Sequence, residues 1–259
     1  MRLRRQAWVL VGTGIGLYLL FLIIQLPATL GWKLAPSSLK QQIQLSGIEG
    51  SIWNGSAEHL MVGNIPAGSF EWQLSPWSLL LGRLSTHVHL ERGQESLDGR
   101  VTLQSANAFT ASGLRLSLNG ETLSGLTTPY LLHGRIRADI KSLSYEKARK
   151  IQADGHILLR DAHVEGPQSF VLGRIDAQAE PEDEGSLLKF SNQDSPLDVN
   201  GSIKLNGNGS YSMKLGILNR DSQRRDISNA LKVLGKPDAT GRVQLKYFGN
   251  LRFHQTARP

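Results

Sequence analysis

Cysteine is absent from this chain of 259 residues. Without a thiol, the chain can form no disulfide, no thiolate nucleophile and no cysteine-ligated zinc or iron–sulfur centre. The absence does not decide the compartment, because a cysteine-free chain is compatible with oxidising and reducing surroundings alike. It does exclude several classes of enzyme and metalloprotein.

Catalytic and metal-binding motifs are also missing. The sequence has no Gly-x-Ser-x-Gly elbow, no phosphate loop ending in Gly-Lys-Ser/Thr and no His-Glu-x-x-His. Of the seven histidines, the close pair His87 and His89 would share one strand face, without a third ligand at a suitable spacing. The acidic residues at 180–184 are interrupted by Pro181 and indicate a solvated connection between strands. We therefore predict no catalytic residue, no metal site and no cofactor.

Positive charge is concentrated at the N-terminus. The formal net charge is +7, and Arg2, Arg4 and Arg5 precede the first apolar run. The remaining surplus is spread thinly over a long chain, which argues against nucleic-acid binding.

One long apolar run stands out. Residues 7–24 carry no charge, and the uncharged stretch continues to Trp32. At about 1.5 Å per residue, this run can cross roughly 30 Å of hydrocarbon. A cleaved secretory signal is the alternative, but its apolar core is typically about 7–15 residues long and ends in a small-x-small site. We predict a cytoplasmic segment at residues 1–6, a transmembrane helix at 7–30 and an exposed linker at 31–42.

The residues flanking this run predict its orientation. Arg4 and Arg5 on its N-terminal side place that end in the cytoplasm by the positive-inside tendency. Trp8 and Trp32 lie at the two ends of the run, where amphipathic rings favour the lipid headgroup level. The bulk of the protein is then expected on the other side of the membrane.

Two glycines lie on one face of the predicted span. Gly12 and Gly16 form a Gly-x-x-x-Gly pattern, which permits close contact with a second helix. Glycine used only as a small membrane residue explains the same pattern, so both interpretations stay open.

Beyond Trp32 the hydropathy pattern alternates with a period of two. Seven glycine-led segments place apolar side chains on one face only, as expected for antiparallel strands with one solvated face. Their spacing is irregular, which excludes a solenoid of fixed repeat. We predict a mainly β protein in which residues 43–259 form an elongated, curved antiparallel sheet. The seven segments are residues 99–103, 113–118, 134–138, 155–159, 173–177, 201–205 and 241–245.

Turns and short helices complete the predicted fold. Four Asp-Gly or Asn-Gly pairs, at residues 98–99, 119–120, 154–155 and 200–201, predict tight turns between strands. Short helical turns are expected at 36–42, 76–81 and 145–150. A longer amphipathic helix is expected near the C-terminus, with Ile227, Ala230, Leu231 and Leu234 on one face. Packing against the sheet and binding to a membrane or partner both remain open for this helix.

A tryptophan-rich stretch lies between the apolar run and the regular strands. Trp53, Trp72 and Trp77 each adjoin turn residues. They suggest a folded cap at the membrane-proximal end of the sheet if the rings are buried, or a partner-binding patch if they are exposed.

At these residues the chain resembles the type II secretion system protein N family. The likeness lies in the basic start and single span, in GSIWNGSA at residues 50–57 and in FEWQL at 70–74. It continues through the strand-turn-strand at 76–84, LKVLGKPD at 231–238, GRVQL at 241–245 and GNL at 249–251. The middle of the chain matches only as generic strands. The resemblance implies a bitopic inner-membrane protein of Gram-negative bacteria with a periplasmic β domain, and no established catalytic residues. The chain also looks like the broader AsmA-like group of anchored, β-rich envelope proteins.

Two functions from different classes follow. The first is a noncatalytic inner-membrane component of type II secretion that contacts other inner-membrane subunits of that system. The second is a lipid-binding or lipid-transfer protein that holds acyl chains in the concavity of its sheet. We find no combination of nucleophile, base and orienting group that would indicate an enzyme.

Overall fold

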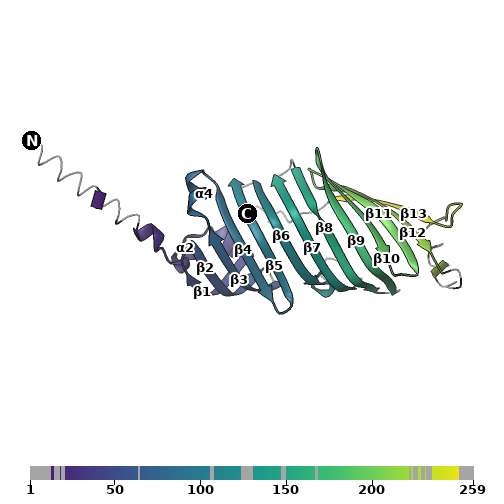
Figure 1. Ribbon diagram of the computed structural model, residues 1–259, viewed down its shortest axis with the longest axis horizontal. Coiled ribbons are helices and arrows are strands. Elements are labelled where there is room, and N and C mark those ends of the chain that lie inside the picture. The colour runs from purple at the N-terminus through teal and green to yellow at the C-terminus, as the bar shows by residue number, and fades with distance from the viewer. Residues whose placement is uncertain are drawn as a thin grey trace, which may run out of the picture. The chain divides into compact units, whose positions relative to one another are not determined.

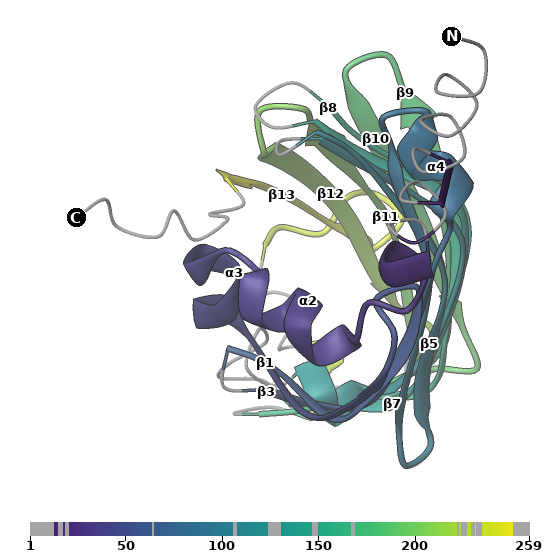
Figure 2. The same ribbon diagram turned by 90° about the vertical axis from the view of Figure 1, so that its left-hand side faces the viewer.

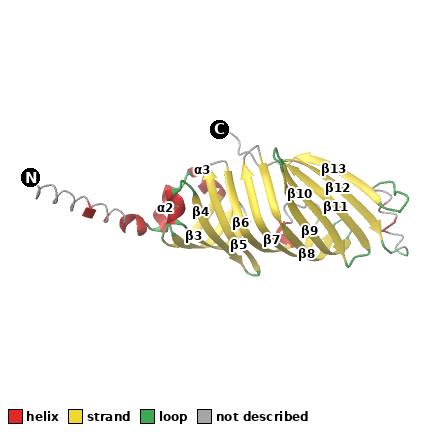
Figure 3. Cartoon of the chain, turned by 45° about the horizontal axis from the view of Figure 1, so that its top comes forward, coloured by secondary structure: helices red, strands yellow, loops and turns green. Residues whose placement is uncertain are grey.

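A computed structural model describes residues 13–14, 18, 21–63, 65–105, 108–123, 131–146, 150–166, 169–221, 223, 227–228, 231 and 235–250. Strands dominate these residues, and the helices are few and short, as the sequence predicts (Figures 1 and 3). Contacts between Cα atoms divide the chain into two compact units, Met1–Gly93 (unit 1) and Gln94–Pro259 (unit 2).

Unit 1 combines short helices with four strands. Neighbouring strands pair antiparallel in chain order from β1 to β4. The short helices expected at 36–42 and 76–81 are confirmed. The elements are α2 (Ala28–Leu34), α3 (Ser37–Gln42), β1 (Ile43–Gly50), β2 (Asn54–Val62), β3 (Ile65–Leu74), α4 (Pro76–Leu80) and β4 (Leu84–Arg92).

The predicted anchor is described only in part. Arg4, Arg5, Trp8, Gly12 and Gly16 lie outside the described residues. Residues 21–24 are helical, residues 25–27 are not, and α2 follows with Trp32 inside it. Among the residues that the structure describes, no helix has the length and apolar character needed to cross a membrane.

Unit 2 is an antiparallel sheet in which each strand pairs with the next along the chain. Figure 2 shows that its strands bend along their length, in keeping with the predicted curvature. The connection predicted at 180–184 is shorter than expected, because residues 180–182 end β9 and pair with β10, and only residues 183–184 form the turn between these two strands. The elements are β5 (Glu95–Ser105), β6 (Ala108–Asn119), the 3-10 helix η1 (Gly120–Leu123), β7 (Leu131–Glu146), β8 (Lys150–Glu165), β9 (Phe170–Glu182), β10 (Gly185–Gln193), β11 (Leu197–Asn206), β12 (Ser210–Asn219) and β13 (Val243–Asn250).

The alternating pattern gives the unit 2 sheet one apolar and one polar face. Residues directly opposite one another on paired strands lie on the same face. One row on the apolar face crosses all nine strands with apolar residues: Leu97, Leu116, Ala138, Ile157, Ala177, Phe190, Gly201, Leu215 and Leu245. The adjacent row on the opposite, polar face contains Arg115, Asp139, His156, Gln178, Lys189, Ser202, Lys214 and Lys246.

The predicted C-terminal helix is partly described. Residues 227, 228 and 231 are helical. Ile227 and Leu231 are buried in a cluster with Leu197 and Val243, which lies on the apolar face near its β13 end. Packing against the sheet is therefore confirmed for these two residues, whereas 230 and 234 lie outside the described part of the chain.

Three of the four tight turns predicted at Asp-Gly and Asn-Gly pairs are wrong. Gly99, Gly155 and Gly201 lie inside β5, β8 and β11 and not in turns, although the Asn-Gly pair at 119–120 does end a strand. These glycines are required by the close approach of neighbouring strands. A Cβ at Gly155 would lie 2.7 Å from the carbonyl oxygen of Asp139, and one at Gly201 would lie 2.4 Å from that of Lys214.

The short helix expected at 145–150 is also wrong. Residues 145–146 end β7, and Lys150 begins β8. The ring of Tyr145 stacks on Phe109 of the neighbouring strand at a centroid distance of 5.3 Å. This cross-strand aromatic contact favours the extended conformation over a local helix.

Candidate functional site

The turn between β1 and β2 holds the end of the apolar N-terminal segment. Trp53 donates a hydrogen bond from its indole Nε1 to the carbonyl oxygen of Ile23, 2.9 Å away. The amide of Ile52 donates to the carbonyl of Leu26 at 3.0 Å, and Pro27 forms an isolated bridge with Ser51. The helical residues 21–24 are thus bonded to the sheet of unit 1.

Trp72 supports the same turn from β3. Its ring stacks on Phe70 at a centroid distance of 5.4 Å, and its Nε1 donates to the carbonyl of Ile52 at 3.1 Å. Gly55 makes room for this ring, because a Cβ there would lie 2.3 Å from a ring carbon of Trp72. The half-buried Trp53 and Trp72 therefore have structural contacts of the kind expected for a cap.

Trp77 is different, because its side chain is 76% exposed on α4. The structure separates the three tryptophans that the sequence groups together. Trp53 and Trp72 form hydrogen bonds at the turn between β1 and β2, and Trp77 faces solvent. Sequence spacing gives no signal for this difference, because Trp53 is bonded to a residue 30 positions away.

The apolar face of unit 2 is a candidate binding surface. Within the described part of the chain, Val243 is the only large side chain buried almost completely, and most apolar residues of this face are half-buried. Leu103 and Tyr247 are 43% and 46% exposed. Helical residues 227 and 231 pack on it near β13. Apolar area of this kind is favourable for burial against an apolar ligand or a partner.

Buried polar side chains also occur on the apolar face, and Asn192 is the least exposed of them among the described residues. Asn192 of β10 is 3% exposed. Its Nδ2 donates to the carbonyl oxygens of Leu172 at 2.8 Å and Leu197 at 2.9 Å, and its Oδ1 accepts from the amide of Val199 at 2.7 Å. The amide side chain thereby joins β9, β10 and β11, and we assign it a structural role.

A histidine and two carboxylates meet at the η1 end of β7. His133 Nδ1 lies 2.8 Å from Glu121 Oε1, and its Nε2 lies 3.0 Å from Glu165 Oε2. Hydrogen bonding to Glu121, and then to Glu165, raises the pKa of His133 above its ordinary value. The two carboxylates thus favour the protonated form of His133.

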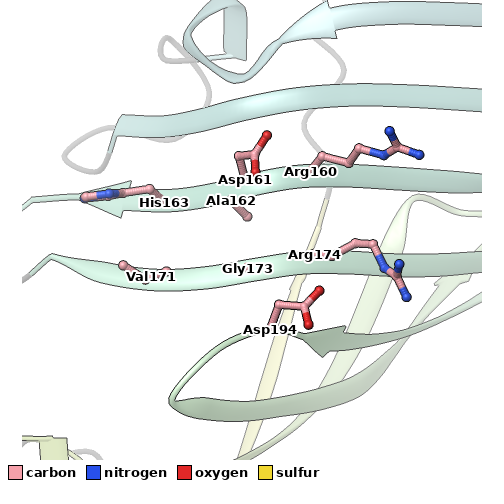
Figure 4. Close-up of a pocket in the computed structure, with 8 residues that line it drawn as sticks. All are labelled: Arg160, Asp161, Ala162, His163, Val171, Gly173, Arg174 and Asp194. Atoms are coloured by element: carbon pink, nitrogen blue, oxygen red, sulfur yellow. The ribbon is translucent and has the colours of Figure 1, made fainter.

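A small open pocket lies on β8, β9 and the β10–β11 connection (Figure 4). Its volume is about 470 Å³. The side chains of Arg160 and Arg174 point in the same direction in Figure 4. Arg174 is already bonded to Asp176 and Gln193. The lining is Arg160, Asp161, Ala162, His163, Val171, Gly173, Arg174 and Asp194. Its two arginines and two aspartates balance in charge, and the pocket contains no arrangement of nucleophile and base.

The histidine pair that the sequence places on one strand lies on β4. His87 and His89 face Gln73 and Glu71 of β3 across the sheet. Within the described residues, no group of three or more histidine or carboxylate side chains is placed to hold a metal ion.

Comparison with known proteins agrees with the resemblance seen in the sequence. The chain matches the family model for "Type II secretion system (T2SS), protein N" over residues 41–246. It is 24% identical over 235 residues to type II secretion system protein N of Vibrio cholerae serotype O1, covering 88% of this chain and 92% of that protein. It is 25% identical over 242 residues to the protein of the same name from Aeromonas hydrophila, covering 90% and 94%. No solved structure gives a significant match.

Proposed function

Because the chain belongs to the type II secretion system protein N family, we propose that it is a noncatalytic inner-membrane component that supports assembly or function of the secretion machinery. That machinery exports folded proteins from the periplasm across the outer membrane. The family match along residues 41–246 carries the proposal, because it runs from just before β1 into β13.

In this proposal residues 1–6 are cytoplasmic, residues 7–30 form the membrane anchor and residues 43–259 form the periplasmic domain. The described end of this segment is suited to a lipid environment, because its apolar side chains are all exposed. These are Phe21, Leu22, Ile23 and Ile24. Exposed apolar side chains on a helix are stable in lipid and costly in water. The Trp53 hydrogen bond to this segment would couple the anchor to the turn between β1 and β2.

The absence of cysteine makes this topology directly measurable. A single cysteine introduced by Asn208→Cys in the exposed β11–β12 turn should react with a membrane-impermeant maleimide once the outer membrane is permeabilised. A cysteine introduced by Arg2→Cys should react only after the inner membrane is also opened. The reverse pattern would contradict the orientation.

The partners proposed are other inner-membrane subunits of the secretion system. Photocrosslinking in native membranes tests this directly, with probes at Gly16 in the anchor and at Leu34, which is exposed on α2. We expect adducts to secretion subunits identified by mass spectrometry, and loss of export when the chain is deleted. Normal export without the chain, together with no such adduct, would refute the proposal.

A second candidate function is favoured by the partly exposed apolar face of unit 2. A face that crosses nine strands with apolar side chains can hold lipid acyl chains as well as a protein. Ile203→Glu places a charge on this face, and Ser202→Glu places the same charge on the polar face of the same strand. If the face holds lipid, only the first variant should lose co-purifying phospholipid. Equal lipid content in the two variants and the unmodified chain would exclude this role.

A further inference from the structure

The connection between β3 and β4 forms an apolar tip, which we define by Trp77, Leu79 and Leu81. Their side chains are 76%, 43% and 77% exposed. Arg83 carries the only formal charge between Glu71 and Glu91 along the chain. A tip this apolar, at the end of a hairpin, exposes to water a surface that would be stabilised by lipid.

The backbone of this tip is internally satisfied. Ser78 Oγ donates to the carbonyl of Ser75 at 2.7 Å and accepts from the amide of Ser85 at 3.1 Å. The carbonyl of Ser78 accepts from the amides of Leu81 at 3.1 Å and Arg83 at 2.9 Å. These polar groups of the turn are thus bonded to one another, and the apolar side chains of the tip point outward from an ordered backbone. Polar backbone groups paired in this way do not oppose transfer into a membrane interface.

The contacts of Trp53 place the tip near the apolar N-terminal segment. The indole of Trp53 bonds to Ile23, and its carbonyl accepts from the amide of Leu74, two residues before α4. Figures 1 and 2 both show α4 on the side of unit 1 where the helical residues 21–24 lie. One tryptophan therefore links the end of the apolar segment to the base of the tip.

We propose that Trp77, Leu79 and Leu81 insert into the interfacial layer of the same phospholipid bilayer that residues 7–30 cross. The occupant of the tip is lipid, because the tip and residues 21–24 both expose apolar side chains and are linked through Trp53, and because a cationic residue, Arg83, lies at the base of the tip. Tryptophan is favoured at this depth, and arginine is favoured beside anionic headgroups. The inference rests on the membrane anchoring proposed above and gives unit 1 a second membrane contact.

The test uses the full chain in vesicles of phosphatidylethanolamine and phosphatidylglycerol. Single cysteines introduced by Trp77→Cys or Leu81→Cys are labelled with an environment-sensitive fluorophore, and quenching is measured with lipids that carry a spin label near the headgroup. Ile24→Cys reports the anchor. Ile65→Cys is the matched control, because Ile65 is an exposed apolar residue at the β2–β3 turn of the same unit. Far-UV circular dichroism confirms that each labelled variant retains its strands.

We expect quenching at 77 and 81 to exceed quenching at 65 by about twofold or more, with a blue shift of the fluorophore emission. Quenching at 24 combined with control-level values at 77 and 81 would overturn the inference and leave the anchor intact. Control-level values at 24, 77 and 81 would overturn both. Control-level quenching in vesicles together with a protein adduct from position 77 in native membranes would overturn the inference in favour of a protein partner.

Discussion

Replacing Asn192 by leucine should destabilise unit 2, because this side chain satisfies three backbone groups of neighbouring strands. The variant leaves two carbonyl oxygens and one amide without the partners that now lie at 2.7–2.9 Å. A buried polar group left unpaired costs about 1–3 kcal/mol. Three such groups cost about 3–9 kcal/mol, and burying the leucine methyl groups recovers about 2 kcal/mol. The net loss is then about 1–7 kcal/mol, and since each carbonyl keeps a second lone pair and the strands can relax, we expect about 3 kcal/mol, in the lower half of that range.

The measurement is urea unfolding of the full chain in detergent. All five tryptophans precede residue 94, so tryptophan fluorescence reports unit 1, and far-UV circular dichroism also reports unit 2. With a urea slope of about 2 kcal/mol per molar, the midpoint of the dichroism transition should fall by about 1.5 M.

Asn200→Leu is the matched control for this experiment. Asn200 is exposed on β11, and its side-chain contact with Asp198 is 3.4 Å long. Its replacement should change the free energy of unfolding by about 0.5 kcal/mol or less. A loss at Asn192 no larger than the loss at Asn200 would refute the reasoning from unpaired backbone groups.

Four further outcomes are expected. Gly185→Ala should lower stability by about 1–3 kcal/mol in urea unfolding, because the added Cβ would lie 1.9 Å from the carbonyl oxygen of Leu205; an unchanged midpoint would contradict the close approach. Leu231→Ala should cost about 2–5 kcal/mol through the cavity left in its buried cluster, as measured by the dichroism transition. Trp53→Phe should cost about 1 kcal/mol by removing its hydrogen bond, and should increase hydrogen exchange at residues 21–24. The pKa of His133 is raised in the folded state, so its contribution is complete below the unfolded value of about 6.5 and is lost as pH rises through the folded value. The native chain should therefore lose more thermal stability from about pH 6 to about pH 8 than His133→Gln does, and parallel losses would contradict this.

The strands of unit 2 and their face preference could be predicted from sequence, because a period of two is local and directly visible. That Ile227 and Leu231 share one apolar face could also be predicted, because helical spacing is likewise a local pattern. The Asp-Gly and Asn-Gly pairs gave the wrong result inside β5, β8 and β11. An Asp-Gly or Asn-Gly pair has the same local sequence whether its glycine lies in a tight turn or inside a strand where the backbone of a neighbouring strand approaches closely.

The amino-acid sequence by itself determined the apolar N-terminal run, the mainly β composition, the family likeness and the tryptophan-rich stretch. Only the tertiary structure decided that Trp53 and Trp72 fasten the β1–β2 turn while Trp77 faces solvent, and that Asn192 joins three strands. The physical reason is the range of the interactions. Alternation and helical spacing depend on residues next to one another, whereas the partner of a buried amide or indole depends on strand register and on contacts between distant parts of the chain.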